Sequence, residues 1–109
     1  MSVFNDFLKE IVSGSKDLAK GALKDLAAQV KNDTQDFINQ AKNDLRDWTR
    51  ELAAGELSKA EFADLVKGQA DLAELHALTE AGIALTRLDR FRDALVQLVV
   101  NTAIRTFIP

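Results

Sequence analysis

The sequence contains no cysteine, no tyrosine and a single proline, which stands at position 109. The lack of cysteine excludes disulfide bonds and thiolate metal sites. Only five glycines accompany the one proline, and 47% of the residues are apolar, which excludes a disordered or loop-rich chain. We therefore expect one domain over residues 1–109, and a modest core if it is compact.

The chain also lacks an excess of positive charge. It has 14 Lys and Arg against 17 Asp and Glu, a net charge of −3. Proteins that bind nucleic acid normally present a clustered basic face. We therefore expect no nucleic-acid partner.

Long apolar runs are missing as well. No stretch reaches the roughly 18 uncharged apolar residues that a membrane span needs, because the longest candidate, 94–108, contains Gln97, Asn101 and Arg105. The opening MSVFNDFLKEIV carries charges inside its apolar run and no basic residue before it, unlike a secretory signal. The expected location is the cytoplasm.

The chain does contain an eleven-residue repeat. VKNDTQDFINQ (30–40) is followed directly by AKNDLRDWTRE (41–51), and the two match in kind at most positions. Eleven residues at about 100° each make nearly three turns, so one face of a helix is kept. The apolar stripe comprises Phe4, Leu8, Val12, Ser15, Ala19, Leu23, Leu26, Val30, Thr34, Phe37, Ala41, Leu45, Trp48 and Leu52. It predicts one helix over about 2–54, near 75 Å long. Ser13, Gly14 and Ser15, with Gly21 just beyond, leave a kink or a short separate first helix as the alternative.

A turn is predicted at 55–57. Gly55 suits the left-handed conformation that ends a helix. Ser58 and Glu61 have the spacing of a capping box, and Leu57 and Phe62 have the spacing of the accompanying hydrophobic staple. A second helix is expected over about 58–107. The predicted fold class is therefore all-α: a long antiparallel hairpin of two helices of about 50 residues each.

Such a hairpin brings the first and last residues together. The apolar residues at this open end are Phe4, Phe7, Leu8, Ile11, Val12, Leu95, Leu98, Val99, Ile104, Phe107 and Ile108. Two helices cannot enclose a core, and each large side chain left in water forfeits about 1.5–3 kcal/mol. These residues are therefore the predicted interface of a homo-oligomer, most simply a homodimer that forms a four-helix bundle.

Charges flank the apolar stripe. Lys9, Lys20, Lys31 and Lys42 recur on one side, and Asp25, Asp36 and Asp47 recur on the other. This pattern fits a solvated helix surface. It also fits two flanks that each face a neighbouring helix of opposite charge.

The repeat over about residues 8–51 resembles the eleven-residue amphipathic repeats of exchangeable apolipoproteins, late embryogenesis abundant proteins and granule-coating phasins. The resemblance implies binding to a lipid or granule surface. Small or polar stripe residues, such as Ser15, Ala19 and Thr34, favour helix packing over insertion into lipid. We expect protein contacts ahead of lipid contacts.

Catalytic chemistry is not indicated. His76 is the only histidine, Glu80 lies one turn on, and Glu74 would lie on the opposite side of a continuous helix. No nucleophile–base pair or glycine-rich phosphate loop is present. We expect no catalytic, cofactor or metal site, and we expect Trp48 to pack in the core.

The leading hypothesis is a non-catalytic structural or interaction module that self-associates through its apolar seam and open end. A peripheral lipid- or granule-surface protein is the first alternative. The second is a module that binds a different helical protein, as a chaperone, secretion or phage-type assembly component.

Overall fold

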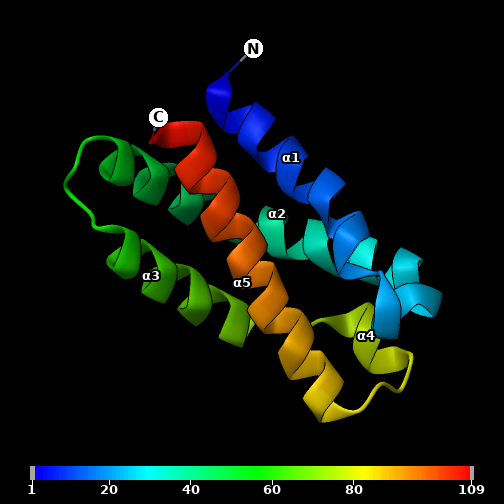
Figure 1. Ribbon diagram of the computed structural model, residues 1–109. Helices are drawn as coiled ribbons and strands as arrows, with labels where there is room; N and C mark the ends of the chain where they lie inside the picture. Colours follow the sequence, from blue (N-terminus) through cyan, green and yellow to red (C-terminus); the bar gives the residue numbers. More distant parts are fainter. Residues whose placement is uncertain (1, 109) are drawn as a thin grey trace.

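The computed structural model describes residues 2–108, and for Gly21 and Ala22 the backbone alone. Within this range all regular secondary structure is helical, which confirms the all-α class (Figure 1). The elements are α1 (Val3–Leu18), the 3₁₀-helix η1 (Gly21–Leu26), α2 (Ala27–Ala53), α3 (Lys59–Leu72), α4 (His76–Glu80) and α5 (Leu85–Phe107).

The expected pair of 50-residue helices is wrong. The first is interrupted between α1 and α2, and the second is interrupted on both sides of α4. A 50-residue helix would be about 75 Å long, whereas the longest dimension of the molecule is 41 Å. The radius of gyration, 13.6 Å, is close to the value of about 13 Å for a compact domain of this length.

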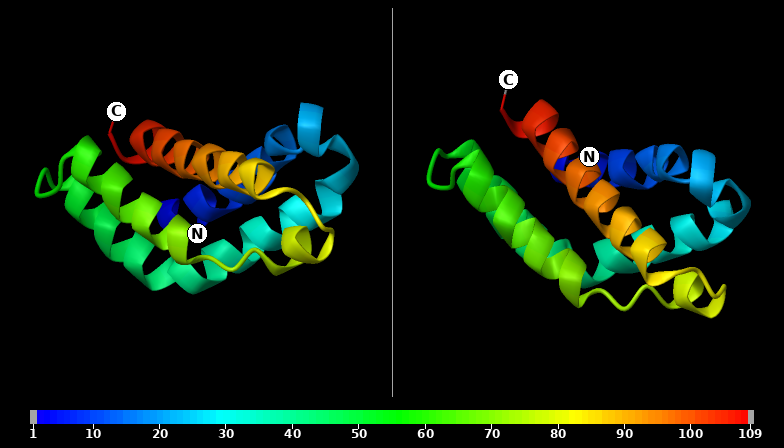
Figure 2. Two further views of the ribbon diagram at one scale, coloured as in Figure 1. Left: turned by 90° about the horizontal axis from the view of Figure 1, so that it is seen from below. Right: turned by 60° about the horizontal axis from the view of Figure 1, so that its bottom comes forward.

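These interruptions let one chain cover its own apolar surface. The chain reverses after α1, and α5 lies between α1 and α3 (Figures 1 and 2). Helix α5 packs against α1 and α3, and α2 packs against α1, α3, α4 and α5. Each long helix therefore has at least two neighbours. Two straight helices would have had one each.

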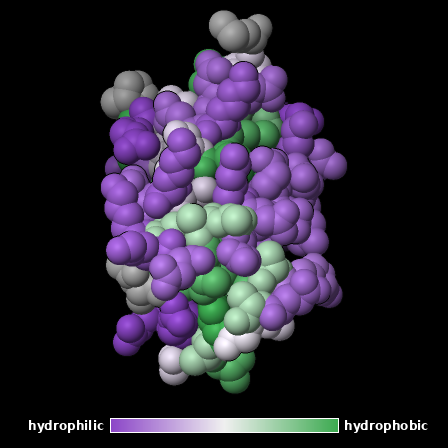
Figure 3. All heavy atoms as spheres, turned by 90° about the vertical axis from the view of Figure 1, so that its right-hand side faces the viewer, coloured by the Kyte–Doolittle hydropathy of each residue, from purple (hydrophilic) through white to green (hydrophobic). Residues whose placement is uncertain are grey.

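The resulting core draws on all four long helices. Its largest fully buried side chains are Phe7, Phe62, Phe91, Ile11, Leu45, Leu78, Leu95, Val30, Val66 and Val99. Four large apolar side chains of the described residues are exposed: Val3, Leu65, Leu72 and Leu85. Figure 3 shows one face of the molecule covered mostly by hydrophilic residues, with hydrophobic ones gathered in its lower part.

The turn between α2 and α3 has the local geometry expected from its sequence. Gly55 has φ +77°, and the amides of Glu56 and Gly55 donate to the carbonyls of Glu51 (2.9 Å) and Leu52 (3.2 Å), the Schellman pattern. Ser58 and Glu61 form both bonds of the capping box, each 3.0 Å long.

Two further residues of this turn lie on the molecule's interior side. Phe62 is fully buried, and Leu57 is half-buried against the core. Both side chains therefore help to fix the direction in which α3 leaves the turn.

Asp33 explains why the second expected helix breaks before α4. Its carboxylate, 1% exposed, accepts hydrogen bonds from the amides of Ala77 (3.0 Å) and Leu78 (2.8 Å). A continuous helix would use those amides internally, and free amides at a helix start attract negative charge. Leu75 just before α4 has φ +48°, a left-handed conformation that interrupts the path of a right-handed helix.

Arg92 of α5 hydrogen-bonds to the end of α3, on the other side of the break between α3 and α4. Its Nη1 donates to the carbonyls of Ala70 (2.8 Å) and Ala73 (2.7 Å). These carbonyls stand at the end of α3, where backbone acceptors lack helical partners. Gly82, with φ +76°, then ends α4 and lets the chain turn into α5.

Candidate binding site

The predicted interface residues are brought together, but within one chain. Those of α1 face those of α5, and Phe7, Leu8, Ile11, Leu95 and Val99 are buried. The remaining six are partly buried against the same core: Phe4, Val12, Leu98, Ile104, Phe107 and Ile108. These residues therefore cover one another, completely or in part, within a single chain.

Aromatic contacts mark this intramolecular junction of the chain's two ends. The rings of Phe7 and Phe107 meet edge to face, with centroids 5.3 Å apart, and Phe4 lies 5.9 Å from Phe7. Glu10 of α1 pairs with Arg105 of α5 at 3.8 Å. The apolar residues at the two ends of the chain therefore pack against one another within one molecule.

The most distinctive surface feature is a groove of about 410 Å³ along the seam of α1 and α2. Three apolar residues, Leu8, Val12 and Ile38, line its floor. Its other lining residues are Lys9, Ser13, Lys16, Lys31, Gln35, Asn39 and Lys42. Among the described residues, four lysines and no carboxylate therefore line this groove.

Helical spacing explains how the lysines come to surround one groove. Lys9 and Lys16 are seven residues apart on α1, and Lys31 and Lys42 are eleven apart on α2. Both intervals bring side chains to the same face of a helix. Because the chain reverses between α1 and α2, the basic flank of one helix meets the basic flank of the other across the seam.

The electrostatics of the groove are unbalanced. None of the four lysines takes part in an ion pair among residues 2–108. Like charges that share a concave surface raise the local positive potential and attract anions. The groove can therefore bind a ligand that combines negative charge with an apolar side.

Polar groups between the lysines can add hydrogen bonds. The side-chain amide of Gln35 donates to Asn39 Oδ1 at 3.2 Å. The Asn39 side-chain nitrogen and the Ser13 hydroxyl, which belong to residues of the groove lining, make no side-chain hydrogen bond among residues 2–108. The Asn39 nitrogen can donate to a bound ligand, and the Ser13 hydroxyl can donate or accept.

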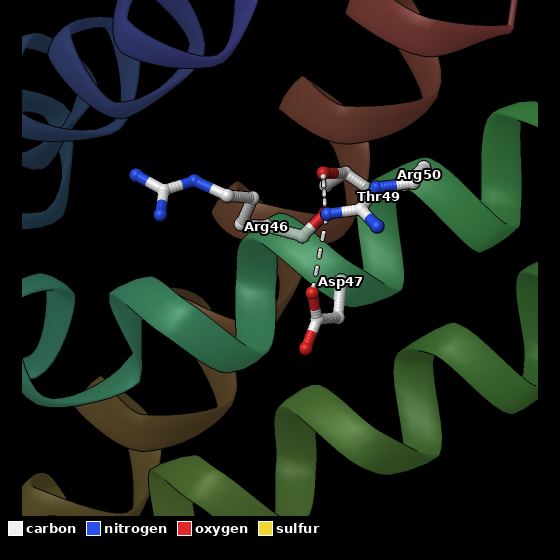
Figure 4. Close-up of polar contacts among 4 residues, drawn as sticks. All are labelled: Arg46, Asp47, Thr49 and Arg50. Atoms are coloured by element: carbon white, nitrogen blue, oxygen red, sulfur yellow. Dashed lines mark hydrogen bonds and ion pairs between the residues drawn. The ribbon is translucent and has the colours of Figure 1, made fainter.

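Beyond the groove, α2 continues with two arginines. Arg46 lies over the ring of Phe4, 5.2 Å from its centroid, and Arg50 pairs with Asp47 at 3.3 Å. Figure 4 shows Arg46 extending away from Asp47 and Arg50, while Thr49 donates to the Arg46 carbonyl. Both arginines also line a hollow of about 270 Å³ with Phe4 and Phe107.

The sequence located this site only in part. Lys9, Lys31 and Lys42 belong to the recognised basic flank, but Lys20 does not reach the groove. It pairs with Asp17 at 2.9 Å, because α1 ends at Leu18. Lys16 takes a place in the groove instead, and only the chain reversal could reveal this.

His76 behaves differently from its expected place on a continuous helix. Its Nε2 lies 2.6 Å from Glu74 Oε2, and both side chains are mostly exposed. The two meet because residues 73–75 are not helical. In the described part of the chain, no group of three or more His, Asp or Glu side chains is arranged to hold a metal ion.

None of the helices in residues 2–108 combines the length and apolar character needed to cross a bilayer. No protein-family model, curated protein or solved structure matches the chain. Any statement about its function therefore rests on the geometry described above.

Proposed function

We propose that this protein is a non-catalytic interaction module whose α1–α2 groove binds an acidic amphipathic helix of a partner protein. One observation carries the proposal: four lysines that have no ion-pair partner within residues 2–108 surround a groove whose described lining is partly apolar and contains no carboxylate. A partner's acidic side chains would neutralise the lysines, and its apolar side chains would pack against Val12, the partly exposed apolar residue of the lining.

The spread of the lysines favours a helix over a small anion. Lys9 and Lys16 are about 10 Å apart along α1, and Lys31 and Lys42 are about 16 Å apart along α2. A phosphate needs donors that converge on one point, whereas these charges follow both sides of a seam. A helix with an apolar stripe and acidic flanks matches that arrangement, and helices commonly bind in grooves between helices.

The concave shape also favours a helix over a lipid surface. Amphipathic helices that lie on membranes present an exposed apolar face to the bilayer. Here the floor residues Leu8 and Ile38 are already buried, and the lysines rise on both sides of them. A flat layer of headgroups could reach the lysines but not the floor.

A synthetic peptide provides a direct test. It should span about five helical turns, with leucines on one stripe and glutamates on both flanks, and binding is followed by fluorescence anisotropy. Lys9→Glu with Lys31→Glu reverses two charges of the groove. Lys59→Glu with Lys67→Glu, on exposed positions of α3, makes the same charge change elsewhere.

We expect the groove variant to bind the peptide about ten-fold or more weakly, because two attractive pairs become repulsive. The α3 variant should bind within about two-fold of the original protein at about 0.1 M salt, where charges beyond about 10 Å are screened. Equal weakening by both variants would reject the groove. Binding to phosphatidylserine vesicles in place of the peptide would favour the lipid alternative.

A further inference from the structure

The segment that joins α1 to α2 is an unusual element. Gly21–Leu26 forms a six-residue 3₁₀-helix, and the residues that precede η1 and α2, Lys20 and Leu26, have side chains that cannot accept a capping hydrogen bond. Runs of 3₁₀-helix longer than three or four residues are uncommon, and within a longer helix they often mark a hinge. The bonds that end α1 are long, 3.3 Å from the amides of both Ala19 and Lys20.

The sequence of the same segment suits an uninterrupted α-helix. The eleven-residue stripe passes through it in phase, with Ala19, Leu23 and Leu26 at stripe positions. No proline occurs before position 109, and Gly21 is the one glycine of the segment. Helical sequence preference and the observed fold therefore conflict at this point, and the packing of α1 on its own chain prevails.

That packing does not require α1 to belong to the same chain. Helix α1 contacts α5 through Phe7 and Phe107 and through Glu10 and Arg105. It also approaches α5 closely at Gly14, where an added Cβ would stand 2.7 Å from Leu98 Cδ1. A second copy offers α1 with identical side chains, so the same contacts can form between chains. Exchange of an identical element is a low-cost route to a dimer.

We propose that the protein forms a dimer by exchanging α1 between two copies, with residues 19–26 as the hinge. In the exchanged form α1, the hinge and α2 make one long helix, and α1 of each copy packs on α2 and α5 of the other. The contacts at the ends of the chain then become the dimer interface. The groove is rebuilt from Lys9 and Lys16 of one copy and Lys31 and Lys42 of the other. Dimerisation can therefore be tested independently of peptide binding to the groove.

Two substitutions of Gly21 act on the hinge in opposite directions. Gly21→Pro suits the folded-back form, because proline is favoured at the first position of a helix and Lys20 before it is extended, with φ −81° and ψ 153°. Proline inside a continuous helix removes a hydrogen bond and clashes with the preceding turn. Gly21→Ala favours the straight helix by about 5.5-fold at each of the two hinges, which makes about 30-fold in the dimerisation constant.

The experiment measures mass by light scattering over a range of concentrations, after refolding to let chains exchange. We expect the original protein to dimerise as its concentration rises, Gly21→Ala to dimerise about 30-fold more strongly, and Gly21→Pro to remain monomeric. A dimer that both variants form equally, or a monomer in the original protein and in Gly21→Ala at every concentration, would overturn the proposal. Circular dichroism establishes that each variant is folded.

Isotope labelling identifies the exchanged element. Chains with ¹⁴N and ¹⁵N are refolded together, and the lysines are cross-linked with a short amine-reactive reagent. If equal amounts of the two labels pair at random in exchanged dimers, about half of the Lys9–Lys42 cross-links in the dimer should join chains of different label. Dimers in which these cross-links join only chains of the same label would show that α1 had not been exchanged.

Discussion

At the scale of single residues, Asp33 decides the position of an entire helix. It is buried, and both of its oxygens accept backbone hydrogen bonds from the start of α4. The sequence does not identify Ala77 and Leu78, more than 40 residues away, as its partners. A long-range polar contact of this kind leaves no periodic signal.

Asp33→Ala should lower the free energy of unfolding by about 3 kcal/mol, because two hydrogen bonds to a charged group disappear and two buried amides lose their acceptor. Asp36→Ala, at an exposed position of the same helix, should change it by less than about 0.5 kcal/mol. Urea denaturation measures both. Similar effects of the two substitutions would contradict the role assigned to Asp33.

Glu61 introduces a pH dependence at the start of α3. The backbone amide of Ser58, and after it the Ser58 hydroxyl, hydrogen-bonds to Glu61 and lowers its pKa below the ordinary 4.5. A carboxyl whose pKa is lower in the folded state stabilises the fold above the unfolded-state pKa, and this contribution disappears as the pH falls through the folded-state pKa.

Glu61→Gln should therefore cost stability at neutral pH, and the difference from the original protein should shrink as the pH falls below 4.5. Thermal unfolding of both proteins at pH 7 and at pH 3 measures this change. A difference that stays constant with pH would mean that the Glu61 charge does not contribute to the cap.

At the scale of elements, the signals within a few residues of the turn predicted its structure correctly. The long apolar stripe predicted helices that are too long. The turn around Gly55 depends on residues within eight positions of one another, so its cap and capping box could be predicted. The stripe correctly identified the buried face of α2, including Val30, Phe37 and Leu45. It also suggested a straight helix through residues 19–26, because periodicity reports which face is apolar and not whether the chain reverses.

The close approach of α1 and α5 at Gly14 can be tested against an open glycine. Gly68 on α3 has nothing within 4 Å of an added Cβ, whereas at Gly14 that atom would meet Leu98. Gly68→Ala should stabilise the protein by about 1 kcal/mol. Gly14→Ala should gain clearly less, because Leu98 must move; equal gains in chemical denaturation would show that the helices are further apart.

At the scale of the whole molecule, the sequence indicated that two straight helices cannot bury all their apolar residues. The structure buries them within one chain and does not need a second copy for this. Two straight helices would leave Phe7, Ile11 and Val99 exposed, which suggested a second copy. The chain instead folds α1 back and buries all three. Folding α1 back within one chain costs no association entropy. It therefore buries these apolar side chains at a lower free-energy cost than association with a second molecule.

The candidate site follows from that same reversal. The basic flank could be read from the spacing of Lys9, Lys31 and Lys42, yet on a straight helix it is only a row of solvated charges. Folding α1 against α2 brings these lysines, with Lys16, around one groove. The site therefore could not be predicted without knowledge of where the first helix ends.

Cross-linking of Lys9 to Lys42 at low protein concentration tests most directly whether α1 lies against α2 within one chain. On a continuous helix these residues would be roughly 50 Å apart, out of reach of a short amine-reactive reagent. We predict a Lys9–Lys42 cross-link in the monomer fraction, identified by mass spectrometry. A monomer that is cross-linked at other lysine pairs but never at this one would contradict the fold, and the groove with it.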